Sequence, residues 1–262
     1  LANSFARKHL IIPAGICATF VVCLTPIAIY GAQQWLGLWP DDNTVFRQFH
    51  HRIKWLWLYM ELGTLVTGLV VAWRYKYPFL IMPIAVTLWY ISMDAVMLVI
   101  DHEDLWNSYT WQFRALVSMY FGALMTLLAF WVDIRARNTA DYAFWLYLFG
   151  VLAFWGGLTS QDSDSELSKF IYFCINLAMI GAGALLVRRV FVIFGALGCC
   201  LYLGHLASTV FEDSWLFPVA LSAIGLGVVY SGIWWQKNEA RITKSAQAIL
   251  PKALQELLAN KV

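Results

Sequence analysis

Long apolar runs alternate with short polar connections along the whole chain. Each run has about twenty residues, the length that an α-helix needs to cross about 30 Å of hydrocarbon. Short connections favour antiparallel hairpins of neighbouring helices. The pattern therefore predicts an all-α integral membrane bundle of about eight transmembrane helices. The predicted spans are residues 10–30, 55–73, 79–100, 113–131, 142–158, 170–187, 190–209 and 215–235.

Composition supports a membrane protein and excludes several other classes. Hydrophobic residues make up 61% of the chain and charged residues 13%, whereas soluble domains have about 25% charged residues. No basic run interleaved with aromatic residues is present, so nucleic acid is not an expected partner. The sequence contains no glycine-rich phosphate loop and no dinucleotide fingerprint, so this chain is not expected to draw energy from ATP. The lipid bilayer is the expected partner, and the cofactor, if there is one, is unknown.

The five cysteines all fall inside apolar runs, and none has Cys-x-x-Cys spacing. We interpret them as small apolar packing residues rather than as metal ligands or redox centres. The chain begins with Leu1 rather than Met, so we expect residues to precede it, and we expect no cleaved signal peptide.

Charges at the span ends predict the orientation of the chain. Basic clusters and acidic clusters alternate from one connection to the next, as an eight-span chain with both ends on one side requires. Most of the 18 lysines and arginines fall on the side that holds both termini, and the positive-inside rule places that side in the cytoplasm. Arg47, Arg52 and Lys54 are the exception, because they lie in the first outer connection. An alternative in which the first run is not a full span would move them inside; we prefer eight spans.

Two segments outside the spans have distinct character. The longest connection, residues 31–54, carries His50 and His51 and is long enough to lie at the membrane interface. After a transmembrane domain of residues 1–236, residues 237–262 form a predicted cytoplasmic amphipathic tail. It has a loose helical face that Pro251 should interrupt, and we expect it to lie along the membrane surface.

The centre of the candidate site is a pair of carboxylates, Glu61 and Asp94. Each lies inside an apolar run, and an ionisable group at that depth is by default a functional-site hypothesis. On a helix, Glu61 shares a face with Thr64, and Asp94 shares one with Tyr90. Both carboxylates lie about 10 Å below the same end of adjacent spans, so they could meet in the bundle. That arrangement would suit a proton relay or a cation site.

Further polar groups lie at a similar depth. His205 is in the seventh predicted span and Asn176 in the sixth. With Asp101, His102 and Glu103 in an outer connection, they suggest an outward-facing polar funnel. Imidazole and carboxylate would suit a divalent metal, but the spacing matches no metal motif.

Each of these residues also has a structural interpretation. Glu61 could pair with Arg52, Lys54 or Arg114 in a bridge that specifies the fold. Asp94 could accept a bond from a neighbouring hydroxyl or indole. His205 fits a satisfied core histidine, and Asn176 fits a polar contact between helices. The paired histidines and the acidic connection fit solvated loops.

Small residues recur every four positions on the last two spans. Such faces let helix backbones approach closely, so we expect the last hairpin to be tightly packed or to meet another protomer. The residues are Ala196, Cys200, Gly204 and Ser208 on the seventh span, and Ala223, Gly227 and Ser231 on the eighth.

Several strings resemble an uncharacterised family of bacterial polytopic inner-membrane proteins. They are PFLIMPIAVTLWYISMD, AFWLYLFGVLAFWGGL, SDSELSKFIYFCINLAMI, RRVFVIFGALGCCLYLGHLA and VFEDSWLFPVALSAIGLG. The resemblance covers most of the chain from the second span onward. It implies a multi-pass protein of the bacterial inner membrane and assigns no role to any residue.

Three functional hypotheses follow. The first is transport or binding of a small solute or ion, with proton coupling as one form, through Glu61 and Asp94. The second is an accessory or structural subunit of a membrane assembly. The third is an intramembrane enzyme, for which the sequence shows no nucleophile or metal constellation.

Overall fold

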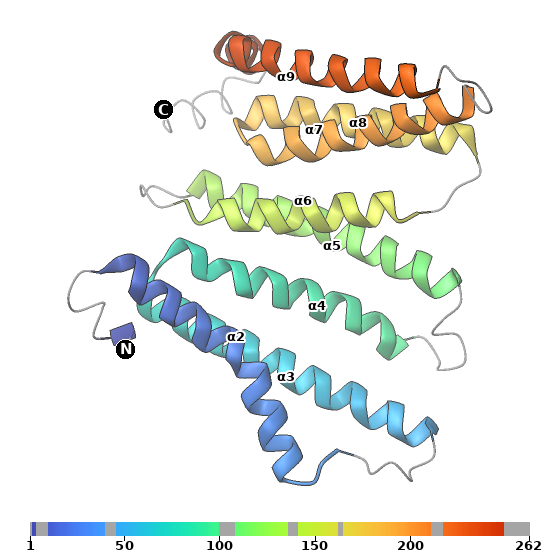
Figure 1. The fold of residues 1–262 in the computed structure, drawn as a ribbon. Coiled ribbons are helices and arrows are strands. Elements are labelled where there is room, and N and C mark those ends of the chain that lie inside the picture. Colours follow the sequence, from blue (N-terminus) through green and yellow to red (C-terminus); the bar gives the residue numbers. More distant parts are fainter. Residues whose placement is uncertain are drawn as a thin grey trace. The chain divides into compact units, whose positions relative to one another are not determined.

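The computed structural model describes residues 2–3, 10–39, 46–99, 108–135, 141–161, 165–210 and 217–248. Within these ranges every regular element is a helix (Figure 1), which confirms the all-α prediction. The elements are α2 (Ile11–Trp35), α3 (Phe46–Tyr75), the 3₁₀ turn η1 (Pro78–Leu80), α4 (Ile81–Val99), α5 (Ser108–Arg135), α6 (Ala143–Thr159), α7 (Glu166–Leu186), α8 (Arg189–Val210) and α9 (Phe217–Ala248).

Six of the described helices are long and apolar enough to cross a membrane, so the chain is a multi-pass membrane protein. They overlap the predicted spans one to four, six and seven, with ends that differ by a few residues. The fifth predicted span corresponds to α6, which is apolar but shorter, at 17 residues. The eighth lies within α9, which is not among the six.

Several helices are longer than the apolar runs from which they were predicted. The connection expected at residues 31–54 is much shorter, because α2 continues to Trp35 and α3 already begins at Phe46. His50 and His51 therefore lie in a helix and not in a loop. An apolar run marks where the chain meets hydrocarbon, whereas the hydrogen-bonded helix continues through polar residues that tolerate helical geometry.

The last helix likewise crosses the boundary expected at residues 236 and 237, since α9 runs unbroken to Ala248. Pro251 and the rest of the tail lie outside the described residues.

The chain divides into two compact units, Leu1–Ser160 and Gln161–Val262. The first holds α2 to α6, and the second holds α7 to α9. In the first unit α5 packs along α6 with backbones in contact. A Cβ atom added to Gly122 would lie 2.2 Å from the Phe154 nitrogen, and one added to Gly157 would lie 2.4 Å from the Ala115 oxygen. Glycine at these positions is what lets the two helices approach so closely.

The second unit has a similar contact between α7 and α8, at Gly183 and Gly195. The small-residue stripe of the last two spans does not form one. A Cβ atom added to Gly204 or Gly227 would meet no described atom within 4 Å. The described residues therefore show no tight packing within the last hairpin at these two glycines, and the alternative, contact with another protomer, stays a prediction.

Helix α2 changes direction about halfway along its length (Figure 1). Pro26 lies inside the helix. It has no N–H to donate to the carbonyl of Val22, and its ring crowds that carbonyl, which bends the helix.

Two helices of the first unit end in an arginine beside an aromatic ring. The Arg135 guanidinium lies 4.7 Å from the ring centre of Trp131, and that of Arg74 lies 5.6 Å from the ring centre of Tyr75. The end of α3 and the end of α5 lie on the same side of an antiparallel bundle. Aromatic rings and long basic side chains are typical of a membrane interface, so these contacts mark one face of the bilayer.

Candidate functional site: a carboxylate pair beside an arginine

Glu61 and Asp94 are brought together by the register of α3 and α4. A Cβ atom added to Gly68 on α3 would lie 3.0 Å from Cγ1 of Ile84 on α4, so these positions face each other. The two helices are antiparallel. Glu61 is seven residues before Gly68 and Asp94 is ten residues after Ile84, so the carboxylates fall within about one helical turn of each other.

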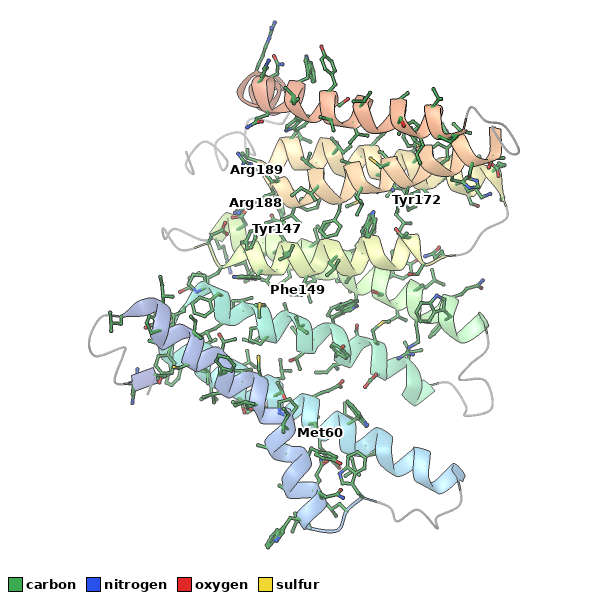
Figure 2. The ribbon with its side chains drawn as sticks, viewed as in Figure 1. Met60, Tyr147, Phe149, Tyr172, Arg188 and Arg189 are labelled. Carbon is green, nitrogen blue, oxygen red and sulfur yellow. The ribbon has the colours of Figure 1, made fainter. Side chains whose placement is uncertain are left out.

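The two carboxyl groups are close enough for their charges to interact directly. Glu61 is 8% exposed, and its Oε2 atom is buried with no hydrogen-bond partner among the described residues. Figure 2 labels Met60, the residue immediately before Glu61, on the stretch of α3 that packs beside α2. Two carboxylates, one of them with a buried free acceptor, therefore share one place in the fold.

A third charged side chain comes from α5. Nη2 of Arg114 lies 3.9 Å from Oδ1 of Asp94, with side-chain exposures of 25% for Arg114 and 35% for Asp94. The Nε atom of Arg114 is buried and has no hydrogen-bond partner in the described part of the chain. Arg114 thus contacts Asp94, the more exposed carboxylate, at long range. It does not bond to the buried Oε2 acceptor of Glu61. We call Glu61, Asp94 and Arg114 the charged cluster.

The charged cluster lies near one end of the first unit, where α3 enters its apolar segment. Glu61 is six residues into the span that begins at Trp55, about 9 Å along the helix axis. Arg114 is three residues into the span that begins at Trp111, about 5 Å deep. Asp94 is two residues from the end of the span Pro78–Val96. Arg114 and Asp94 are therefore both nearer a span end than Glu61 is.

Thr64 was predicted to share a helix face with Glu61, and Tyr90 to share one with Asp94. Among the described residues, neither forms a hydrogen bond with the charged cluster. The Thr64 hydroxyl donates to the carbonyl of Met60 at 2.7 Å, within its own helix. Tyr90 is 58% exposed, and its ring lies beside that of Trp89.

Other polar contacts near the cluster were not singled out from the sequence. The Trp89 indole donates to the Ser118 hydroxyl at 3.0 Å, and Ser118 donates to the Ala153 carbonyl at 2.9 Å, which ties α4, α5 and α6 together. Gln33 on α2 donates to the Leu56 carbonyl at 3.2 Å, and its Oε1 is buried without a described partner. The sequence position of Ser118 could have pointed to it, because Ser118 lies one helical turn after Arg114 on α5.

A buried carboxylate at the other end of α5 was also missed. Asp133 is 7% exposed and accepts a hydrogen bond of 3.4 Å from the hydroxyl of Tyr147, a fully buried residue of α6 that is labelled in Figure 2. The signal was an aspartate nine residues before the predicted span 142–158, but its place at the end of the preceding span made a functional role less evident.

Asn176 and His205 belong to the second unit. Asn176 is fully buried, and its amide donates to the carbonyl of Tyr172 at 2.8 Å. Its Oδ1 is 1.9 Å from where a Cβ atom on Gly198 would lie, so the side chain fills the space that this glycine leaves between α7 and α8. The hydrogen bond stays within α7, and Oδ1 has no hydrogen-bond partner among the described residues, so the polar contact between helices stays a prediction.

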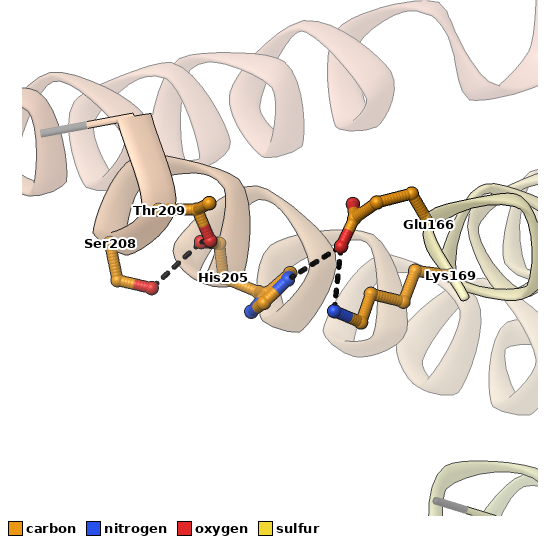
Figure 3. Close-up of polar contacts among 5 residues, drawn as sticks. All are labelled: Glu166, Lys169, His205, Ser208 and Thr209. Atoms are coloured by element: carbon orange, nitrogen blue, oxygen red, sulfur yellow. Dashed lines mark hydrogen bonds and ion pairs between the residues drawn. The ribbon is translucent and has the colours of Figure 1, made fainter. Parts of the chain in front are cut away.

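His205 lies in a small polar cluster at one end of α8 (Figure 3). Its Nε2 is 4.0 Å from Oε1 of Glu166, and the same oxygen accepts a bond of 2.7 Å from Nζ of Lys169. The His205 carbonyl accepts bonds from the hydroxyls of Ser208 and Thr209. Since the His205 side chain is 41% exposed, it is not a satisfied core histidine. We call Glu166, Lys169 and His205 the exposed cluster.

Among the described residues, no group of three or more His, Cys, Asp or Glu side chains could hold a metal ion. Asp101, His102 and Glu103 lie outside the described residues, as do the side chains of His50 and His51. The charged cluster can bind a proton or a cation. Two adjacent carboxylates repel each other when both are ionised, and a proton or a cation between them relieves that repulsion.

No protein family, curated protein or solved structure matches this chain. The function must therefore be argued from the geometry of the charged cluster.

Proposed function

We propose that this chain is a multi-pass transport protein of the bacterial inner membrane that moves an ion or small solute. In this proposal the Glu61–Asp94 pair is its cation- or proton-binding site, both termini are cytoplasmic, and the pair opens toward the outer side. The observation that carries the proposal is the buried Glu61 acceptor beside a second carboxylate.

Energetics favour a functional site over a bridge that merely holds the fold. A carboxylate inside an apolar segment costs a few kcal/mol unless it is paired or neutralised. A stabilising bridge would place a base on Glu61. Among the described residues, Glu61 instead faces Asp94, and the nearest described base, Arg114, contacts Asp94 at 3.9 Å. Among the described side chains, which do not include those of Arg52 and Lys54, no second base contacts the pair. In this proposal a transported or coupling cation supplies the second positive charge.

The exposure of the Asp94 side chain supports a route by which a cation could reach the pair. Asp94 is 35% exposed at its side chain, whereas Glu61 is 8% exposed as a residue. The pair thus has one member open to its surroundings and one inside the bundle, the order expected when a cation arrives at one carboxylate and is shared with the other.

The test is flux and binding with the carboxylates neutralised one at a time. The full chain is reconstituted in liposomes, and internal pH and uptake of a panel of monovalent cations are followed under an imposed pH gradient. Glu61→Gln and Asp94→Asn should each lower flux at least tenfold. Asp141→Asn is the matched control, because that exposed aspartate accepts a bond from the Phe144 amide at 3.1 Å and lies at a helix start.

A second measurement, tryptophan fluorescence, does not require the transported ion or solute to be known. The fluorescence of the 14 tryptophans should change with pH in the wild type, since Trp89 lies five residues from Asp94, and the change should be lost in Glu61→Gln. If both variants fold and neither flux nor fluorescence depends on either carboxylate, the proposal is wrong.

A further inference from the structure

We infer that Arg114 is a resident cation of the site, so that the Glu61–Asp94 pair binds one additional unit charge, a single proton, in each cycle. This inference rests on the proposed function and specifies the ion that the site takes.

Geometry makes Arg114 part of the same charge balance. The guanidinium comes from a third helix, lies 3.9 Å from Asp94, and has a buried Nε without a partner among the described residues. Arginine does not deprotonate in proteins, so this positive charge is permanent. Its location three residues into the span of α5 keeps it within the region where charges are weakly screened by water.

The charge count then limits the ligand. Among the described side chains, two ionised carboxylates and one guanidinium leave a single negative charge, and one proton cancels it. A divalent cation would leave a net positive charge in a poorly solvated place. It would also need six or more oxygen ligands in the case of calcium, and the described residues show no group of three metal-ligating side chains.

The closeness of the carboxyl groups favours a proton over a larger monovalent ion. The register of α3 and α4 already brings the two carboxyl groups within about one helical turn of each other, so the pair can share a proton without a large movement of either helix. The proton comes from the water that reaches Asp94, binds one carboxylate oxygen, and leaves by the reverse step toward the other side in the transport cycle.

Among the side chains that the structure describes, few other charges lie on the helices packed against the cluster. The side chains of Arg47, Arg52 and Lys54 on α3 are not described. In α2 and α6 no Asp, Glu, Lys or Arg occurs between Ile11 and Trp35 or between Ala143 and Thr159. In α5, Asp133 and Arg135 lie at the opposite end. On α3, Lys54 precedes Glu61 by two turns and therefore shares its helix face. Tyr59 and Tyr90 are the nearest tyrosines on α3 and α4, and both are exposed.

The experiment counts protons. The full chain in nanodiscs is moved from about pH 9 to about pH 5.5. This window lies above the range in which ordinary carboxyl groups titrate. Proton uptake is measured with an indicator dye. The signal of the Glu61→Gln/Asp94→Asn double variant is subtracted, so that only the pair is counted. The wild type should take up one proton per chain.

Variants of Arg114 give the decisive comparison. Arg114→Gln removes the resident charge, so the pair should take up two protons in the same window, whereas Arg114→Lys should keep the count at one. Lys54→Gln is the matched control for removing a nearby base, and it should also leave the count at one.

The outcomes separate the two proposals. If neutralising both carboxylates does not change proton uptake, the proposed function itself fails. If neutralising them abolishes uptake but Arg114→Gln still takes up one proton, only the role of Arg114 is wrong. A wild-type count of two, or displacement of the proton by sodium or potassium at equal ionic strength, overturns the inference without any arginine variant.

Discussion

Glu61 in the first unit and Glu166 in the second carry the same carboxylate in opposite surroundings. Glu166 starts a helix, is strongly exposed, and accepts a 2.7 Å bond from Lys169 one turn later. Glu61 lies inside an apolar segment, is 8% exposed, and keeps a buried oxygen without a described partner. The Glu166–Lys169 pair is exposed to solvent and contributes little to stability. The arrangement of Glu61 raises the energy of the folded protein until a positive charge arrives, and that difference is why only the charged cluster supports a proposal for function.

The largest expected effect tests whether Asn176 belongs to packing and not to a polar site. Gly198→Ala should destabilise the protein by about 2–3 kcal/mol, because the new methyl group overlaps the Asn176 amide. Asn176→Ala opens that space, so the double variant should lose much less than the sum of the two single variants. Unfolding in mixed detergent micelles measures the free energies, and flux per folded protein should be unchanged in Asn176→Ala. A strictly additive double variant would contradict the observed packing.

The second prediction compares the basic partners of the two clusters. Arg114→Leu should cost about 1–2 kcal/mol, because it leaves two carboxylates without their resident cation in a partly buried place. Lys169→Leu removes an exposed base from an i, i+3 pair and should cost less than about 0.5 kcal/mol. Thermal unfolding of both variants in the same detergent is the measurement. Equal losses would mean that the two clusters do not differ as their burial indicates.

The third prediction concerns the carboxylates themselves. At about pH 9, Glu61→Gln should stabilise the protein by about 1 kcal/mol while lowering flux, because it removes a like-charge contact with Asp94. Glu166→Gln should instead leave the stability nearly unchanged, because its ion pair is exposed to solvent. A loss of stability in Glu61→Gln would show that Glu61 serves as a structural bridge, the alternative that the sequence left open.

The smallest effects come from two helix ends in the left-handed region. Val187 ends α7 with φ of 56°, and Lys76 follows α3 with φ of 53°. A left-handed backbone costs an L-residue about 1–2 kcal/mol, and more when the side chain is β-branched. Val187→Gly should therefore raise stability by about 1 kcal/mol, and Lys76→Gly by less. Melting temperatures of the two variants rank them, and a larger gain at Lys76 would contradict this reasoning.

Sequence patterning predicted most of the fold because a bilayer imposes a length that apolar runs must match. It predicted the helix ends poorly, since α3 starts at Phe46 among polar residues that hydrocarbon excludes but a helix accepts. The approach of Glu61 and Asp94 followed from equal depth on adjacent antiparallel helices. The contact of Arg114 with Asp94 did not follow, because an arginine near a span end usually extends to the interface.

Packing was harder to predict than burial. Spacing of small residues pointed to Gly204 and Gly227, whereas the closest backbone contacts occur at Gly122 and Gly157. A small residue permits close approach without specifying which neighbour will make it. The division after Ser160 also has no signal in composition, because both units are built from the same kind of apolar helix.

Helix α6 has a consequence for the lipid around the first unit. Its 17 residues span about 26 Å along the helix axis, less than the hydrocarbon thickness of about 30 Å. Its neighbour α5 has 28 residues and is held against it by glycine contacts. Lipids beside α6 must compress, while α5 must tilt or emerge into the headgroups. The protein should consequently sit with least strain in bilayers of shorter acyl chains, and acyl-chain length becomes a variable to control when its activity is compared between preparations.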